Sequence, residues 1–441
     1  MTSRRFDTVV VGGGSAGCVV AARLSEHPDR TVCLVEAGPD YGPYAGGGWP
    51  EDMLDARRLA FTHSWETAVE DRSQLRARII GGCSAHNACV VLAGAPGDYD
   101  EWGHGWSHEV LAPYLDRAER ELRVRRFEPD VLSPWHAAFV AVAGADAIVH
   151  PVNAVGPVRW NAAFAYLDPA RERPNLTILA DTLADRVDPD ARCVMTSHGP
   201  LFAETIVLAA GAYGSPAILL RSGIGPGLAH DLPVGEGLVD HVGVGLGWEP
   251  TDALRQEVAA FEADRDVYMA QLSIRAASPA CPHGVWDLFL FPALEPGPEI
   301  SGAVFAMKPR SRGRVALLSP DPRSPLDVEH GFLTDERDVE VLAHGVERLR
   351  ALAAVEPLSR YVLREERPGP EVDAVAHVRS AARGFFHPTG TCAIGRVVDA
   401  RGRVLGLEGV VVADASIMPT IPRANTNLTV VAVAERLAEL L

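Results

Sequence analysis

The sequence predicts an α/β fold with two domains: a nucleotide-binding domain around a parallel sheet, and a second domain built on an antiparallel sheet with helices. The chain opens with FDTVVVGGGSAGCVVAARLSE, a pattern typical of a buried strand, a glycine turn and a helix. The same pattern returns in LFAETIVLAAGAYGSPAILL. From Gly243 to about Ala381, strand-like segments alternate without such turns, which favours an antiparallel sheet. The 441 residues are enough for two such cores.

The composition limits the possible partners and the compartment. Hydrophobic residues make up 47% and charged residues 22%, as in ordinary globular proteins. The formal net charge of −17 argues against nucleic acid or an anionic membrane as a partner. The N-terminus runs directly into a strand and offers no secretory signal, and no apolar run reaches about 18–20 uncharged residues. We therefore expect a cytoplasmic protein with no membrane span.

The cysteines give no sign of a metal or disulfide site. Seven are scattered along the chain without a CxxC pair, at positions 18, 33, 83, 89, 193, 281 and 392. This pattern argues against zinc and against a disulfide framework. Their odd number suits a reducing compartment, and we expect no metal ligands.

The opening motif has the spacing of a Rossmann dinucleotide-binding turn. Strand Thr8–Val11 is followed by GGGSAG, whose glycines fill the GxGxxG positions, and by a helix from Cys18 to Leu24. The first glycine permits a tight turn, the second lets a pyrophosphate approach the backbone, and the third lets helix and strand pack closely. Free N–H groups at the helix start bind phosphates. The predicted binding residues here are Gly12, Gly14, Ser15, Ala16 and Gly17.

A second strand, TVCLVEAG (Thr31–Gly38), supports this interpretation. Glu36 ends that strand where a carboxylate holds the adenosine ribose in dinucleotide-binding folds, and Ala37 follows it. A glycine turn without a ligand is the alternative, because GxGxxG alone is weak evidence.

The segment RARIIGGCSAHNACVVLAG is unusual for a plain dehydrogenase. After Gly81 and Gly82, small residues run up to His86. Small side chains there would let the backbone lie flat against a large planar ring.

The remaining elements follow from periodicity and turn residues. Residues 125–160 are irregular and broken by prolines. The predicted helices are Gly105–Val124 and Asp335–Val355, and the predicted strands are Asn175–Ala180, the strand with Val187, Ile206–Ala210, Val267–Ser278, Gly284–Leu294, Gly302–Arg310 and Val410–Pro419.

The last third of the chain carries the candidate chemistry. His387 lies in GFFHPTGTCAIG, and the paired residues Asn425 and Asn427 enter an apolar helix some forty residues later. An imidazole titrates near neutral pH and is suited to take a hydroxyl proton. Together with the glycine turn, these pieces indicate a flavin whose reactive ring faces His387 and the asparagines.

These motifs resemble the glucose–methanol–choline (GMC) family of FAD-dependent oxidoreductases, in particular its choline oxidases and alcohol dehydrogenases. The matching stretches are VVVGGGSAG, GGCSAHNACVV, GAYGSPAILLRSGIG, VGEGLVDH, KPRSRGRV, HPTGT and NTNLT, in that order. The resemblance implies a Rossmann-like FAD-binding domain in three parts, 1–120, 166–242 and 382–441. It implies a substrate-domain or lid insertion at 121–165, shorter than in relatives, and a substrate-binding domain at 243–381.

The resemblance also implies roles for individual residues. His387 is the catalytic base, and Asn427 orients the alkoxide oxygen, with Asn425 as the alternative. Val187 contacts adenine through its backbone, and the dipole of the final helix faces the flavin pyrimidine. The cofactor-binding residues implied in the later segments are Gly82, Ser84, His86, Asn87, Ala88, Val187, Ala210, Gly211, Asp414, Ala415, Asn425, Leu428 and Thr429.

His86 stands where relatives resembling choline oxidase carry a covalent bond to the flavin. We therefore expect a covalent histidyl-FAD, the alternative being a neutral histidine packed beside the dimethylbenzene edge. His241 is expected to be structural. The aromatic residues Trp160, Phe164, Phe385 and Phe386 are candidates for the pocket wall, or else core residues.

The expected reaction is oxidation of a primary alcohol to an aldehyde, with electrons passed to oxygen or to a quinone or other carrier. The alternatives are a GMC-fold lyase or photodecarboxylase, a dehydrogenase that tailors a natural product or redox cofactor, and a nonenzymatic flavoprotein. No carboxylate is placed to hold a quaternary ammonium, so choline is not favoured. The protein is expected to be a monomer or homodimer.

Overall fold

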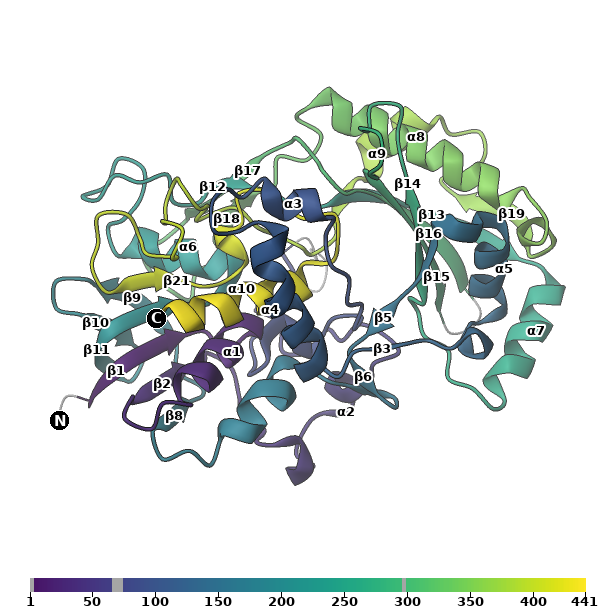
Figure 1. Cartoon of the computed structure of the whole chain (residues 1–441). Coiled ribbons are helices and arrows are strands. Elements are labelled where there is room, and N and C mark those ends of the chain that lie inside the picture. The colour runs from purple at the N-terminus through teal and green to yellow at the C-terminus, as the bar shows by residue number, and fades with distance from the viewer. Residues whose placement is uncertain (1–3, 66–73, 296–298) are drawn as a thin grey trace.

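The structure, a computed structural model, describes residues 4–65, 74–295 and 299–441. Within these residues, two seven-stranded sheets lie in separate halves of the molecule (Figure 1). One is largely parallel and the other antiparallel, which confirms the predicted α/β fold with a second antiparallel domain. Strand β1, which begins at Arg4, and the C-terminus both lie in the half that holds the first sheet (Figure 1).

The first sheet has the order β8–β2–β1–β11–β10–β9, and β21 also pairs with β11. Strands β2 and β21 and the C-terminal half of β1 are Val-rich and buried on both faces, as parallel strands covered by helices are. The bounds are β1 (Arg4–Val11), β2 (Val32–Val35), β8 (Leu176–Leu179), β9 (Ala184–Asp188), β10 (Cys193–Thr196), β11 (Gly199–Leu208) and β21 (Val410–Val412).

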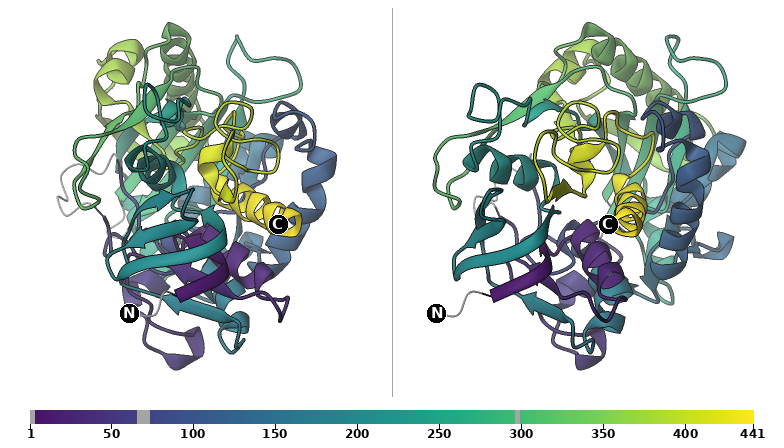
Figure 2. Two further views of the ribbon diagram at one scale, coloured as in Figure 1. Left: turned by 90° about the vertical axis from the view of Figure 1, so that its left-hand side faces the viewer. Right: turned by 60° about the vertical axis from the view of Figure 1, so that its left-hand side comes forward.

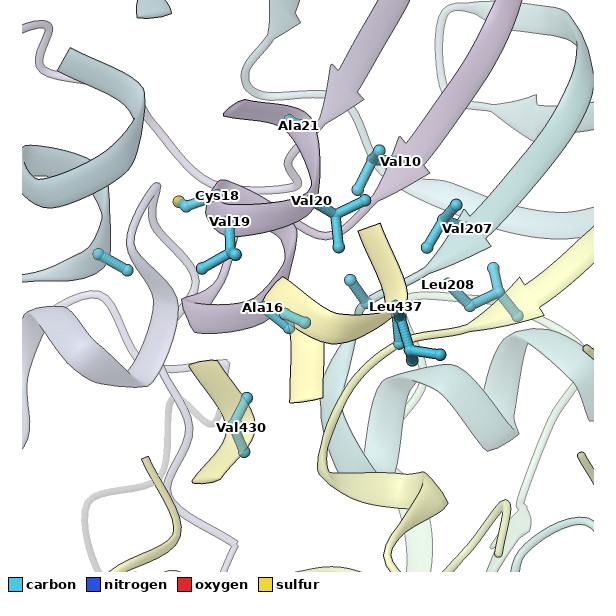
Figure 3. Close-up of a cluster of buried hydrophobic side chains, with 14 of the residues drawn as sticks. Val10, Ala16, Cys18, Val19, Val20, Ala21, Val207, Leu208, Val430 and Leu437 are labelled. Carbon is cyan, nitrogen blue, oxygen red and sulfur yellow. The ribbon is translucent and has the colours of Figure 1, made fainter. Parts of the chain in front are cut away.

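Two helices that begin at the candidate site pack along each other over this sheet. They are α1 (Ser15–Leu24) and α10 (Thr426–Leu440). Figure 3 shows Ala16 and Val20 of α1 in one cluster with Leu437 of α10 and with Val10 and Val207 of the strands. Helix α4 (His108–Glu121) lies against α10, and α6 (Gly211–Arg221) follows β11 (Figures 1 and 2).

The second sheet is antiparallel with helices on one face, and its strands β14, β15 and β16 form a meander. Its order is β19–β13–β16–β15–β14–β4, with β20 also paired to β13. Alternate residues of β16 are buried, so one face packs and the other opens toward the first domain's loops. The strands are β4 (Ala147–Val149), β13 (Val242–Pro250), β14 (Leu272–Ala276), β15 (Leu288–Glu295), β16 (Glu299–Ala306), β19 (Val362–Arg367) and β20 (Arg383–Gly384).

The other elements are short connections and covering helices. The helices are α2 (Glu51–Leu54), α3 (Pro96–Asp100), α5 (Pro134–Ala143), α7 (Asp252–Glu262), α8 (Glu336–Ala353) and α9 (Ala374–Ala381). The strands are β3 (Arg125–Arg126), β5 (Pro151–Val152), β6 (Ala154–Val155), β7 (Val158–Arg159), β12 (Glu236–Leu238), β17 (Gly313–Leu317) and β18 (Leu326–Glu329). No helix of the described ranges is long and apolar enough to cross a membrane.

The structure differs from the sequence prediction at three places. Residues 125–160, predicted to be irregular, contain helix α5 and the short strands β3 to β7. The predicted strand 410–419 ends at Val412, because the Asp414 side chain accepts the Ser416 N–H and starts a 3-10 turn. Helices α7 and α9 lie in the region 243–381, where we predicted strands and one helix. The division of the chain into five segments stays a prediction.

Candidate active site

The first turn and the small-residue segment form one backbone cradle. Gly12 has φ +98°, and a Cβ on Gly17 would lie 1.8 Å from the Gly12 carbonyl oxygen, so both positions require glycine. A Cβ on Gly82 would lie 2.6 Å from the Cα of Gly14. The turn before α1 and the segment that starts at Gly82 therefore face each other closely, as a site for a phosphate-bearing planar cofactor requires.

Glu36 lies at the edge of this cradle. Its carboxylate accepts the N–H groups of Gly13 and Gly38, each at 2.8 Å. Burial raises the pKa of Glu36 to about 7, against the lowering effect of these hydrogen bonds. Two more acceptor sites remain on its oxygens. The Ala37 carbonyl accepts from Arg78 Nε at 3.0 Å.

The small-residue segment is held by its own hydrogen bonds. Ser84 Oγ donates to the Gly81 carbonyl at 2.6 Å and accepts the Ala162 N–H at 3.0 Å. Asn87 Oδ1 accepts the Cys89 N–H. The His86 ring is buried, and its Nδ1 has no hydrogen-bond partner among the described residues. Burial lowers the pKa of His86 to about 4, so the ring is neutral.

A bulge in the chain positions His387. Val239 pairs with Thr389, and Val242 pairs with Gly384. Between these two pairs, one segment has two residues, 240–241, and the other has four, 385–388. The four loop out, with Phe386 at φ +62°. The buried Asp240 carboxylate accepts the His387 N–H at 2.8 Å and holds the bulge.

Three side chains meet at the bulge. His387 Nδ1 lies 2.9 Å from His241 Nδ1, and His387 Nε2 lies 3.4 Å from Asn425 Nδ2. His241 Nε2 lies 3.0 Å from the Pro422 carbonyl oxygen. Burial, and then the neighbouring His241, lower the pKa of His387 well below its ordinary value, so the ring is uncharged at neutral pH. A neutral imidazole in this place can take a proton from a hydroxyl group.

The structure brings Asn425, and not Asn427, to His387. Asn427 Oδ1 instead accepts from Ser15 Oγ at 2.8 Å, at the start of α1, and its Nδ2 is buried without a partner among the described residues. Residues two apart at the start of a helix point to opposite sides, about 200° around the axis. The predicted pairing of Asn427 with His387 is therefore wrong in this geometry, and the alternative, Asn425, takes its place.

The other predicted C-terminal residues are largely bound within the protein. The buried Asp414 carboxylate accepts from Gly211 N, Ser215 Oγ and Ser416, and burial raises its pKa. Thr429 Oγ1 lies 3.0 Å from the Tyr99 hydroxyl. The side chain of Leu428 is in the core. These side chains are thus engaged within the protein, and their predicted contacts with a cofactor stay a prediction.

Ala210 and Val187 are bound in a similar way. The N–H of Ala210 donates to Ser215 Oγ at 3.0 Å. The N–H of Val187, on β9, donates to Ser222 Oγ at 2.9 Å. The predicted adenine contact of Val187 stays a prediction.

An aromatic wall stands beside His387. Phe385 lies 4.5 Å from the His387 ring and is stacked on Phe305 with centroids 3.6 Å apart. Phe291 meets both edge-on. Of the predicted wall residues only Phe385 lies here. Phe386 is 40% exposed, and Trp160 and Phe164 pack together in the core of the first domain.

The sequence did not predict the contact between His241 and His387. His241 lies in the motif VGEGLVDH and was expected to be structural, and the two histidines are 146 residues apart in the chain. The signal available was a DH pair just before the strand that pairs with the His387 segment. Among the described residues, no group of three or more His, Cys, Asp or Glu side chains is arranged to hold a metal ion.

Comparison with known proteins shows which family the chain belongs to. Two models of the GMC oxidoreductase family match, one over residues 6–155 and 147–243 and one over residues 309–434. The 5-(hydroxymethyl)furfural oxidase of Methylovorus sp. (strain MP688) is 32% identical, covering 100% of this chain and 99% of that one. The choline oxidase of Arthrobacter globiformis is 29% identical, covering 100% and 95%.

The fold comparison agrees. The crystal structure of pyridoxine 4-oxidase from Mesorbium loti has a TM-score of 0.86 and 26% identity, covering 99% of both chains. The alignment with the furfural oxidase extends over 532 positions, so the 441-residue chain lacks segments that this relative has. With family models matching both ends and relatives aligned along its whole length, the chain belongs to the GMC oxidoreductase family of FAD-dependent enzymes that act on CH–OH groups.

Proposed function

We propose that this enzyme oxidises a primary alcohol carried on an aromatic or other planar apolar body, with His387 as the base and Asn425 as the group that positions the alcohol oxygen. The observation that carries the proposal is the meeting of His387 and Asn425 beside the wall of Phe385, Phe305 and Phe291. Pockets lined by apolar side chains with few polar groups bind apolar ligands and orient them through those groups.

The residues present fit FAD. The close approach of Gly14 and Gly82 leaves backbone, without side chains, to face the cofactor. The Asn427 Nδ2 donor is buried and unpartnered among the described residues, a state that costs about 1–3 kcal/mol until a ligand accepts from it. Glu36 would hold the ribose, and the start of α1 would hold the phosphates.

In this proposal, the side chains at the bulge remove the proton of the alcohol hydroxyl group. The alcohol hydroxyl donates to His387 Nε2, and Asn425 Nδ2 donates to the same oxygen as it becomes negative. FAD supplies the acceptor for the hydride that leaves the α-carbon, so one proton and one hydride leave the alcohol and an aldehyde remains. Phe385 and its neighbours exclude water, which strengthens the hydrogen bonds at the reacting oxygen.

The names of two relatives support the substrate class. The furfural oxidase and the pyridoxine oxidase are each named for an alcohol on a planar ring. The stacked pair of Phe385 and Phe305 offers a flat apolar face of the kind that such rings pack against.

A panel of alcohols tests this function. The holoenzyme is mixed anaerobically with aromatic, long-chain, polyol and amino primary alcohols, and bleaching of the flavin is followed. We expect aromatic alcohols to bleach it fastest. Reoxidation by oxygen and by a quinone-like dye is then compared to identify the acceptor. If no alcohol bleaches the flavin, or if polyols bleach it fastest, the proposal is wrong.

The asparagine pair gives a sharper prediction. We expect Asn425→Ala to lower the rate constant of flavin reduction by about 10- to 100-fold, because one donor to the developing oxyanion is lost. We expect Asn427→Ala to leave that rate within a few-fold and to weaken FAD retention, because its side chain faces Ser15. Stopped-flow reduction and the dissociation constant of FAD separate the two. If Asn427→Ala slows flavin reduction and Asn425→Ala weakens FAD retention, then Asn427 positions the alcohol oxygen, as the sequence predicted.

We further propose that FAD is attached covalently through His86. A ring nitrogen would bond to the 8α-methyl carbon in place of one of its hydrogens, and the two electrons released would pass to the flavin and then to the enzyme's electron acceptor. A neutral, buried imidazole with an unpartnered nitrogen among the described residues is suited to carry such a bond. Acid precipitation of the holoenzyme is expected to leave the yellow colour in the pellet, and His86→Ala is expected to release it into the supernatant. If all the colour of the wild-type enzyme stays in the supernatant, no such bond exists.

A further inference from the structure

We infer that His241 is a positioning residue that selects the tautomer of His387, through a chain of hydrogen bonds from the Pro422 carbonyl to His241 and then to His387. This inference rests on the proposed role of His387 as the base. It adds the reason why Nε2, and not Nδ1, of His387 is the proton-accepting nitrogen.

The chain starts at an atom whose role is certain. The Pro422 carbonyl oxygen only accepts hydrogen bonds, so the nitrogen 3.0 Å from it, His241 Nε2, carries a hydrogen. The carbonyl is held in place because the next residue, Arg423, is bound to the buried Asp98 carboxylate through both its backbone N–H and its guanidinium.

His241 is neutral. Its side chain is fully buried, and burial lowers its pKa to about 3, with a smaller contribution from the positive charge of Lys308. The other titratable groups beside it are His387 and the adjacent Asp240, whose carboxylate faces the His387 backbone. A neutral imidazole with a hydrogen on Nε2 has a lone pair on Nδ1.

The lone pair on His241 Nδ1 determines the tautomer of His387. The two Nδ1 atoms are 2.9 Å apart, so the Nδ1 of His387 must donate. A neutral His387 then has its lone pair on Nε2, the atom that faces Asn425 Nδ2, a donor. If His241 Nδ1 donated to His387 instead, the buried His241 would carry hydrogens on both nitrogens. His387 Nε2 would then also carry a hydrogen and would face the Asn425 Nδ2 donor without an acceptor between them.

The pair also suits the protonated state of His387. When Nε2 takes the hydroxyl proton, both of its nitrogens donate, and His241 Nδ1 remains a matched acceptor. The rings meet edge-on at 88° with their Nδ1 atoms 2.9 Å apart, and this contact fixes the orientation of the His387 ring. A third group that orients the base serves the same purpose in other catalytic dyads.

Nitrogen NMR of the holoenzyme labelled with 15N-histidine tests the tautomer without any turnover. The His387 signals are assigned by their loss in His387→Gln. We expect a protonated Nδ1 and an unprotonated Nε2 in the wild-type enzyme. In His241→Leu we expect a mixed or reversed tautomer, and in His241→Asn, which keeps an acceptor at the δ position, the wild-type tautomer. A protonated Nε2 in wild-type His387 at neutral pH overturns the inference, even if the leucine variant does not fold.

The kinetic arm uses the same variants. We expect His241→Leu to slow flavin reduction at saturating alcohol about 10- to 100-fold, a part of the roughly 10²–10⁴ that a positioned base contributes, with little change in alcohol affinity. His241→Asn is expected to recover most of the rate. The control is His377→Leu, a buried histidine of α9 bound to the Gly245 carbonyl at 2.9 Å. An unchanged rate and tautomer in His241→Leu overturns the inference, whereas a wild-type rate in His387→Ala would instead overturn the proposed function.

Discussion

Replacing His387 by alanine is expected to reduce the rate constant of alcohol-dependent flavin reduction by about 10²–10⁴-fold, the contribution of a positioned general base. In the proposed mechanism His387 Nε2 is the proton acceptor, and it lies 3.4 Å from Asn425 Nδ2. The fold holds the ring through the contact of its Nδ1 with His241, and it holds the backbone N–H through Asp240. Anaerobic stopped-flow reduction measures the effect directly. FAD binding is expected to change little, because the cradle at Gly14 and Gly82 is untouched.

The same residue predicts a pH profile. Burial lowers the pKa of His387 well below the roughly 6.5 of an unperturbed imidazole, so the base form persists as the pH falls through that value. The reduction rate is therefore expected to stay level from pH 8 to about 6.5 and to fall only at lower pH. A loss of rate centred at or above pH 6.5 would contradict this. His377→Ala is the control, because its ring is buried but bonds to the Gly245 carbonyl.

Local patterns predicted where the backbone requires glycine, whereas the cofactor contacts of these residues stay a prediction. The glycine turn, the carboxylate that ends β2 and the small residues after Gly81 each depend on steric rules within a few residues. The structure adds what those rules leave open, which is that Gly14 and Gly82, from separate segments, form one surface.

The contacts that could not be predicted from the sequence depend on how distant segments of the chain pair in the fold. The contact of His241 with His387 requires Val239 to pair with Thr389 and Val242 with Gly384, and no local pattern encodes that register. The choice between Asn425 and Asn427 depended on the residue where α10 begins, and helix boundaries are the least certain part of a sequence prediction. Once Thr426 is the first helical residue, Asn427 turns toward Ser15.

Replacing Glu435 by alanine is expected to destabilise the fold by about 3–5 kcal/mol, the cost of breaking a buried ion pair by removing one partner. The Glu435 side chain is fully buried on α10. It accepts two hydrogen bonds from Arg23 of α1, at 2.8 and 2.9 Å, one from the Tyr166 hydroxyl at 3.0 Å and one from Arg117 of α4 at 3.3 Å. Its loss leaves a half-buried arginine and a buried hydroxyl without their shared acceptor.

Glu26→Ala is the matched control, because Glu26 pairs with the same Arg23 at 2.7 Å but is 47% exposed. Screening by solvent limits its expected cost to about 0–1 kcal/mol. Urea unfolding of both variants, followed by far-UV circular dichroism, measures the difference, and equal costs would contradict the prediction. The comparison bears on the proposed active site, because α1 begins at the backbone cradle and α10 begins next to Asn425. Glu435 joins these two helices near their C-terminal ends, so its loss is expected to weaken FAD retention as well as stability.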